Sequence, residues 1–277
     1  MENGHLESNF EVQRFRNRRQ EIMNRTGAGT DPWYQRAFRS EYLQVYPGRS
    51  VESAETEVAA ALDWLSPEEG ARVLDLCCGA GRHSRWLQES AVELHGLDLS
   101  EELLAEARRQ LQESVRLHQG DMRQLPFEVD HFDAVRMFFT SFGYFETDEE
   151  NQGVLAEVAR VVRKGGRFLL DLPDRDLIVN KLVPVSERVV GDKSILEERS
   201  ITEDGKRVEK RVTLTGPAGE SHYIESVRLF TKSEVTKMLE ESGWAPLACR
   251  GDWDGSDQIP GTSPRMIFTA ERSAQHK

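Results

Sequence analysis

Cysteine, long apolar runs and net positive charge are all scarce in this chain of 277 residues. Its three cysteines, Cys77, Cys78 and Cys249, are too few for a disulfide framework, and no second Cys/His pair supplies the usual zinc spacing, so we expect no metal. No apolar stretch approaches the ~20 residues of a membrane-spanning helix. The start, "MENGHLESNF", has neither a basic leader nor the apolar segment of a secretion signal. These absences predict a globular protein of the cytoplasm, outside any membrane.

Basic residues are outnumbered, with 36 Lys and Arg against 48 Asp and Glu and a net charge of -12. Such a balance opposes general binding to a phosphate backbone. The first fifty residues are a slight exception, with eight arginines against six acids. The run "RFRNRR" from Arg14 to Arg19 is either an RNA contact or a solvated helix face, and charge runs usually stay in water. Nucleic acid is therefore not the partner we expect.

The chain shows no repeat, and its pattern changes three times. Residues 1–50 are predicted to form an irregular N-terminal helical cap, with Trp33 and Tyr34 among arginines. Residues 51–182 alternate strands and helices at intervals of about 25 residues, which indicates a parallel sheet covered on both faces. Residues 183–230 are predicted to be an antiparallel β insertion, and residues 231–277 the C-terminal part of the core.

The predicted elements of the core follow from apolar periodicity. A helix runs from Val51 to Trp64, and the last helix of the alternating part ends at Gly165-Gly166. The strands are "RVLDLC", "ELHGLDL", "VRLHQGD", "FDAVRMFF" and "GRFLLDLP", and the helices between them are "RHSRWLQES", "SEELLAEARRQLQE" and "EENQGVLAEVARVVRKGG".

The last hundred residues read as hairpins followed by a return to the sheet. Alternating stretches "SILEERSI", "RVEKRVTLTG" and "SHYIESVRLF" are separated by the turn signals "EDGK" and "GPAGE". A helix capped by Thr231 or Ser233 follows, and then two final strands, "APLACRGDW" and "PRMIFTAER". The sheet should therefore close with an antiparallel edge, and the exposed strands of the insertion offer an edge for a homodimer.

The stretch "VLDLCCGAGRHS" carries the first signs of a ligand. Gly79 and Gly81 allow close approach to the main chain at the carboxyl end of a strand, where ligands of open parallel sheets bind. Asp75 just before them would repel a pyrophosphate but suits an ammonium or sulfonium group. Ser84 also stands where the dinucleotide fingerprint has its third glycine.

Two further acids follow at the ends of the next strands. Asp98 lies 23 residues after Asp75, about where an acid accepts hydrogen bonds from ribose hydroxyls. Asp121 can accept from an exocyclic amine while the amide of Met122 donates to a ring nitrogen, as adenine requires. Three acids at three strand ends describe a ligand built of a cationic amino acid, a ribose and adenine.

The motifs "VLDLCCGAGRHS", "GLDLSEELLAEAR", "GDMRQLPF" and "FDAVRMFFTSFGYF" resemble, in order and spacing, those of the class I S-adenosylmethionine-dependent methyltransferases over about residues 70–175. The cap, the insertion and the ending "GDWDG...SPRMIF" look like a subgroup that acts on small molecules. The resemblance implies a Rossmann-like α/β fold with a seven-stranded sheet of order 3-2-1-4-5-7-6, and S-adenosylmethionine as cofactor. It places the methionine part on the loop Asp75–Gly81, the ribose on Asp98 and the adenine on Asp121 with Met122. The implied cofactor-binding residues are Asp75, Cys77, Gly79, Gly81, Asp98, Leu99, Asp121, Met122 and Phe138.

The acceptor side is much less specific in the sequence. Candidates for taking a proton from the acceptor are Tyr144, His83 and His222, although a lone histidine is more often simply packed. Aromatic and charged residues that would wall an acceptor pocket, or else belong to the core, are Tyr42, Tyr46, Arg49, Phe139, Tyr144, Tyr223, Arg228 and Trp253.

The function predicted is methyl transfer to an N, O or C atom of a small molecule by in-line displacement. A first alternative uses the sulfonium for cyclisation or elimination within the cofactor and releases methylthioadenosine. A second is an RNA or protein methyltransferase, or a regulatory protein that binds S-adenosylmethionine.

Overall fold

The computed structural model describes residues 32–38, 42, 51–217 and 219–274, and it divides the chain after Pro32. Everything below concerns the unit that begins at Trp33. Most of the predicted cap at 1–50 therefore lies outside the described residues.

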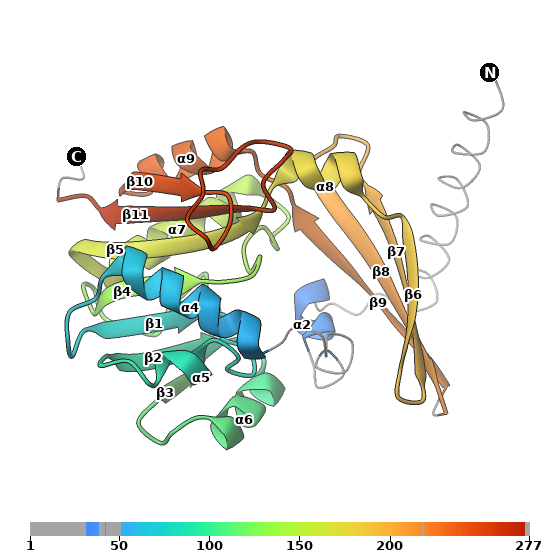
Figure 1. The fold of residues 1–277 in the computed structure, drawn as a ribbon, viewed down its shortest axis with the longest axis horizontal. Helices are drawn as coiled ribbons and strands as arrows, with labels where there is room; N and C mark the ends of the chain where they lie inside the picture. Colours follow the sequence, from blue (N-terminus) through green and yellow to red (C-terminus); the bar gives the residue numbers. More distant parts are fainter. Residues whose placement is uncertain (1–31, 39–41, 43–50, 218, 275–277) are drawn as a thin grey trace. The chain divides into compact units, whose positions relative to one another are not determined.

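A seven-stranded sheet forms the centre of this unit (Figure 1). Its strands are β1 (Arg72–Leu76), β2 (Glu93–Asp98), β3 (Arg116–Gln119), β4 (Phe132–Met137), β5 (Val162–Pro173), β10 (Trp244–Arg250) and β11 (Arg265–Arg272). They lie in the order β10-β11-β5-β4-β1-β2-β3, with β1 to β5 parallel and β11 antiparallel to both of its neighbours. The predicted order and the predicted antiparallel edge are both confirmed.

Helices cover both faces of this sheet because the buried strands are apolar on both sides. Trp244 and Phe168 pack with Val154 of α7 on one face, and Ala134 and Leu169 pack with Val58 of α4 on the other. Figure 1 shows α4 crossing in front of the sheet and α7 behind it. The described helices after α2 are α4 (Val51–Leu65), α5 (Ser84–Leu87), α6 (Glu101–Gln110), α7 (Asp148–Val161), α8 (Arg175–Lys181) and α9 (Lys232–Glu241).

The end of α7 differs from the prediction. We expected Gly165-Gly166 to end the helix, but it ends at Val161, and Val162 is already extended and paired with Phe132 of β4. Gly166 instead lies in β5, where an added Cβ would come within 2.7 Å of the Asp133 carbonyl oxygen. This glycine therefore permits two strands to approach closely, and the β-branched Val162 begins the strand.

The remaining strands form a separate antiparallel sheet of order β6-β7-β8-β9, which is the predicted β insertion. Its strands are β6 (Val185–Val190), β7 (Lys193–Ile201), β8 (Arg207–Gly216) and β9 (Gly219–Arg228). Both β6 and the short helix α8 were missed by the sequence analysis. The Arg228 amide donates to the Gly143 carbonyl at 2.8 Å, which ties the end of β9 to the loop after β4.

A short helix, α2 (Trp33–Ala37), lies against β9. The Tyr34 ring packs edge-on against Phe145 at 5.5 Å, and the Trp33 ring packs edge-on against Tyr144 at 4.9 Å. None of the described helices is both long and apolar enough to cross a membrane.

Candidate cofactor and acceptor site

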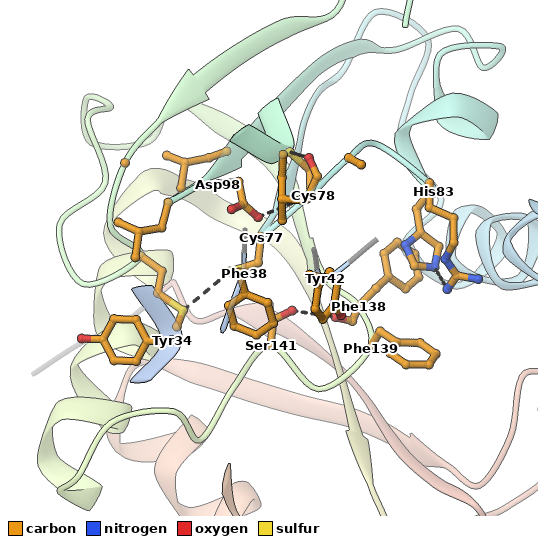
Figure 2. Close-up of a pocket in the computed structure, with 18 of the residues that line it drawn as sticks. Tyr34, Phe38, Tyr42, Cys77, Cys78, His83, Asp98, Phe138, Phe139 and Ser141 are labelled. Atoms are coloured by element: carbon orange, nitrogen blue, oxygen red, sulfur yellow. Dashed lines mark hydrogen bonds between the residues drawn. The ribbon is translucent and has the colours of Figure 1, made fainter. Parts of the chain in front are cut away.

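A cavity of about 300 Å³ opens at the carboxyl ends of the parallel strands. Figure 2 shows Tyr34 towards one end of it, Asp98 with Cys77 and Cys78 in the middle, and His83 with Phe138 and Phe139 towards the other. Its lining residues are Tyr34, Phe38, Tyr42, Cys77, Cys78, Gly79, Ala80, Arg82, His83, Arg85, Leu97, Asp98, Leu99, Leu103, Gln110, Gly120, Asp121, Met122, Phe138, Phe139, Ser141, Tyr144 and Phe145. The cavity thus lies where the topology of an open parallel sheet puts a ligand.

The loop after β1 has an unusual backbone. Cys77, Gly79 and Gly81 all have positive φ, at 63°, 55° and 83°, and for Cys77 this conformation is strained. An added Cβ on Gly81 would come within 3.0 Å of Leu111. The loop therefore exposes main chain to the cavity at Gly79 and packs its far side on α6.

Asp75 lies beneath this loop rather than in the lining of the cavity. Its carboxylate is 2% exposed and accepts a hydrogen bond from the Ser84 hydroxyl at 2.5 Å. Ser84 stands where the dinucleotide-binding motif has its third glycine. Its hydroxyl thus holds Asp75, the first of the three predicted acids. Gly81 is also outside the lining.

Asp98 does line the cavity, at the end of β2. Its carboxylate accepts from the Gly79 amide at 2.8 Å and from the Ser100 amide at 2.9 Å. Burial raises the pKa of Asp98, against the effect of these hydrogen bonds. Helix α6 is capped by Ser100, which accepts from the Leu103 amide, so the carboxylate is not used as the helix cap.

Asp121 and Met122, which follow β3, also line the cavity. Burial opposes the charge of Asp121, but hydrogen bonds from the Arg123 side chain and amide outweigh it and lower the pKa of this carboxyl. The Met122 sulfur lies 3.7 Å from the Cys77 sulfur. Met122 lines the cavity together with the apolar residues Leu97, Leu103 and Phe145. This compartment of the cavity is therefore apolar, with the Asp121 carboxylate at its edge.

His83 lines the opposite end of the cavity and is held on two sides. Its ring stacks on Phe138 with centroids 4.1 Å apart, and its Nε2 lies 2.6 Å from Oε2 of Glu57 in α4. Arg82 donates to the same Glu57 oxygen at 2.7 Å. Burial lowers the pKa of His83, so the imidazole is neutral at pH 7.

The sequence analysis did not select Glu57, although its position in α4 indicates a buried carboxylate. It lies three residues after Ala54 and four before Ala61, on the buried face of α4. A carboxylate in the apolar face of a helix needs a partner. The sequence does not show that the partner is His83.

The loop after β4 is strained where it meets the end of the cavity that His83 and Phe138 line. Phe139 and Thr140 both have positive φ, at 59° and 65°. The buried Asp171 carboxylate accepts from the Phe139 amide at 2.8 Å and from the Arg265 guanidinium at 2.7 Å, and Arg265 also donates to the Thr140 hydroxyl. Burial raises the pKa of Asp171. Together these bonds hold Phe139 against the cavity in a conformation that costs about 1–3 kcal/mol per residue.

Three further aromatic side chains, Phe38, Tyr42 and Tyr144, line the cavity. The Phe38 ring lies 5.0 Å from that of Tyr42 and 5.5 Å from that of Tyr144. Tyr34, Phe38 and Tyr42 are spaced four residues apart, as on one face of a helix, and this spacing is the signal that would have found Tyr34 and Phe38.

Other predicted pocket residues lie elsewhere. Arg228 is buried in ion pairs with Asp148 and Glu234, and Trp253 packs behind Phe138, not on the cavity. His222 and Tyr223 lie on β9 outside the lining. Tyr46 and Arg49 are outside the described residues.

The chain is similar to known methyltransferases. A family model described as a methyltransferase domain matches residues 73–166. The putative methyltransferase YqeM of Bacillus subtilis is 37% identical over 75% of this chain and 86% of its own length. The dTDP-3-amino-3,6-dideoxy-alpha-D-glucopyranose N,N-dimethyltransferase of Streptomyces fradiae is 29% identical over 71% of this chain and 78% of its own. The SAM-bound amino pentose methyltransferase CalS10 of Micromonospora echinaspora superposes with a TM-score of 0.59 at 26% identity, over 84% of this chain and 96% of its own.

The residues of the cavity fit the cofactor of that family. The buried Asp98 carboxylate can accept from ribose hydroxyls, the compartment of Leu99 and Met122 has apolar walls and an edge carboxylate suited to adenine, and the Gly79 loop lines the cavity with main chain. The chain belongs to the S-adenosylmethionine-dependent methyltransferases, and S-adenosylmethionine is its cofactor.

Proposed function

We propose that this enzyme methylates an amine nitrogen of a small molecule, with amino sugars as the favoured class of acceptor. The observation that carries the proposal is one cavity with an acidic and apolar middle around Asp98 and an aromatic end around His83. Two of the similar proteins bear the names of amino-sugar methyltransferases, which favours nitrogen over oxygen or carbon.

We assign a part of the cofactor to each predicted residue that lines the cavity. Asp98 would hold the ribose, Asp121 with the Met122 amide the adenine, and the main chain at Cys77 and Gly79 the methionine part. When bound there, S-adenosylmethionine supplies an electrophilic methyl group on a positively charged sulfur. Asp75, which lies under the loop, would act by holding the loop's shape through Ser84.

The aromatic end would align the acceptor and exclude water. Phe138, Phe139 and Tyr144 line it from the loop after β4, and Phe38 and Tyr42 line it from the N-terminal side. Such walls favour in-line geometry by fixing the acceptor, which is the main requirement of methyl transfer. An amine needs in addition a group that takes its proton, and His83 is the neutral imidazole present.

We also propose a cellular compartment, a domain division and an oligomeric state for the enzyme. The free thiols of Cys77, Cys78 and Cys249 support a reducing compartment, as in the cytoplasm. The separate sheet β6–β9 supports the division into a cap at 1–50, a core at 51–182, an insertion at 183–230 and a C-terminal part at 231–277. The edge strand β6 exposes Val185 and Val189, which supports a homodimer through the insertion.

The experiment that tests the function is incubation of the purified enzyme with S-adenosylmethionine and, one at a time, amino sugars linked to nucleoside diphosphates, matched hydroxy sugars and simple primary amines. Mass spectrometry should find a methylated amine together with S-adenosylhomocysteine. Methylation of the hydroxy sugars alone would overturn the choice of nitrogen.

A further inference from the structure

Glu57 is a carboxylate with an unusual position. It lies on the face of α4 that packs on the sheet, is 9% exposed and is surrounded by apolar neighbours such as Val58 and Ala61. Burying an ionised carboxylate is costly unless it is paired and hydrogen-bonded. Its partners are Arg82 and His83, both from the loop that leads into α5.

The short contact between Glu57 and His83 determines which imidazole nitrogen carries the proton. Burial opposes the charge of Glu57, but the bonds from His83 and Arg82 outweigh it and lower the pKa of this carboxyl, so it is ionised and can only accept. Nε2 lies 2.6 Å from the Glu57 oxygen and 2.8 Å from Nη2 of Arg82, which can only donate and itself donates to that oxygen at 2.7 Å. An unprotonated Nε2 would face the ionised carboxylate lone pair to lone pair, so Nε2 is the protonated nitrogen and shares the Glu57 oxygen with Arg82 as a second donor. In neutral His83 the lone pair then lies on Nδ1, for which no hydrogen-bond partner exists among the described residues.

The ring is also held on its face. Phe138 stacks on it at 4.1 Å, Trp253 packs on Phe138 at 5.5 Å, and Trp64 stacks on Trp253 at 5.6 Å. This row of rings keeps the imidazole from tilting, while Glu57 keeps it from rotating in its plane. The stacked rings and the Glu57 contact therefore both fix the orientation of His83 at the cavity wall.

We propose that Glu57 is a positioning residue that makes His83 the proton acceptor for the amine. This rests on the proposed function. As the acceptor nitrogen bonds the methyl carbon, the electron pair of the broken carbon–sulfur bond leaves with sulfur and the nitrogen becomes positively charged. Its N–H proton then passes to Nδ1, the imidazolium donates from Nε2 to the Glu57 carboxylate, and the proton is later released to water.

The charges that face His83 come from four elements. Glu57 of α4 and Asp75 of β1 favour the imidazolium, and Arg82 of its own loop disfavours it. Arg136 of β4 lies 5.7 Å from the ring of Phe138, which stacks on His83. Because Glu57 supplies the hydrogen bond and a nearby negative charge, its loss must lower the pKa of His83 further.

The first test needs neither an acceptor nor turnover. Nitrogen-15 NMR of histidine-labelled protein should find neutral His83 protonated on Nε2, and Glu57→Gln should move its titration to lower pH. The matched control is Glu55→Gln, an exposed carboxylate on the same helix that should leave the titration of His83 unchanged. A proton on Nδ1 in the wild-type protein, or an unchanged titration in Glu57→Gln, would overturn the proposal whatever the acceptor is.

The second test uses the first amine that the wild-type enzyme methylates. Glu57→Gln should lower kcat roughly 10- to 100-fold, leave KM for S-adenosylmethionine within about twofold, and move the acid limb of kcat to lower pH. Glu57→Asp, which keeps the charge but shortens the side chain, should recover part of kcat. If Glu57→Gln does not fold, Glu57→Asp should shift the His83 titration and the acid limb in the same direction by a smaller amount, because the hydrogen bond is lost and the charge remains. An unshifted pH limb with a changed KM would indicate a purely structural carboxylate and refute the proposal, while leaving the methyltransferase function intact.

Discussion

Asp98 shows at the scale of one residue how the account can be tested. Its carboxylate lines the cavity and accepts two backbone hydrogen bonds that shape the loop. In Asp98→Asn the amide keeps the size but has one acceptor oxygen instead of two, so the ribose site should lose a charge-assisted bond worth about 1.5–3 kcal/mol. We therefore expect S-adenosylhomocysteine to bind roughly 10- to 100-fold more weakly by calorimetry.

The control for this variant is Asp254→Asn, which removes a carboxylate from an exposed loop. It should bind S-adenosylhomocysteine as the wild-type protein does. Wild-type affinity in Asp98→Asn would mean that the cofactor is held elsewhere. A lower kcat with unchanged binding of S-adenosylhomocysteine would also contradict a role of Asp98 in holding the ribose, because we expect that pattern for Glu57.

Single residues also show where sequence reasoning stops. Asp75 and Asp98 follow the same rule, an acid at a strand end, yet only Asp98 lines the cavity, because Ser84 holds Asp75 beneath the loop. Glu57 and His83 lie 26 residues apart and meet only when α4 packs on the sheet. The motif spacing therefore indicated Asp98 as a lining residue, and the tertiary packing determined the surroundings of His83.

At the scale of elements, Gly143 links the loop after β4 to the insertion. Its φ is 92°, and an added Cβ would come within 2.8 Å of the Arg228 carbonyl oxygen, which is backbone and cannot move cheaply. Gly143→Ala should therefore lower the free energy of unfolding by more than about 1 kcal/mol in denaturant titrations.

The control is a substitution of Gly153, which we expect to stabilise the protein. It is exposed in the interior of α7, where an added Cβ meets no atom within 4 Å. Gly153→Ala should raise the free energy of unfolding by about 0.5–1 kcal/mol because alanine restricts the unfolded chain. Equal effects of the two substitutions would contradict the described geometry of the loop after β4.

Three histidines join β2, β3 and the start of β4. His95 Nδ1 lies 3.2 Å from His118 Nε2, and the His131 ring packs edge-on to His95 at 5.7 Å. Burial lowers the pKa of all three below the ordinary value of 6.5, although Glu93 acts in the opposite direction on His95. The folded state thus disfavours their protonation, so their contribution to stability is complete above about pH 6.5 and is lost as the pH falls through their lowered pKa values.

Replacing one of these histidines should weaken that pH dependence. His118→Asn keeps a hydrogen-bonding side chain but cannot titrate, and we expect its denaturation midpoint to fall less between pH 7.5 and pH 5.5 than that of the wild-type protein. The same fall in both proteins would show that other groups cause the acid sensitivity.

The elements themselves were largely predictable, with instructive exceptions. Strands β1 to β5 stand out because buried parallel strands are apolar runs, and α9 begins where the sequence places Thr231, whose capping box includes Glu234. The boundary between α7 and β5 was wrong because Val161 and Val162 fit either periodicity. β6 alternates weakly, with exposed valines on an edge strand, and gives no clear signal.

At the scale of the whole molecule, the cavity depends on segments that are distant in sequence. The β1 loop, the ends of β2 and β3, the loop after β4 and residues near Tyr34 all contribute walls. The motif order within residues 73–166 matches the family model, so the cofactor end was foreseeable. The acceptor end combines segments whose contacts follow no short motif, which is why sequence reasoning selected Arg228 and Trp253 while the structure puts them in an ion-pair cluster and behind Phe138.

The most direct test of the central claim is the identity of the nucleoside product. The purified enzyme is incubated with S-adenosylmethionine alone and with the amino-sugar panel, and the products are identified by mass spectrometry. We expect S-adenosylhomocysteine only when an amine acceptor is present, in equal amount to the methyl groups gained by that amine. Methylthioadenosine formed without any acceptor would contradict it, because the sulfonium would then react within the cofactor instead of donating its methyl group.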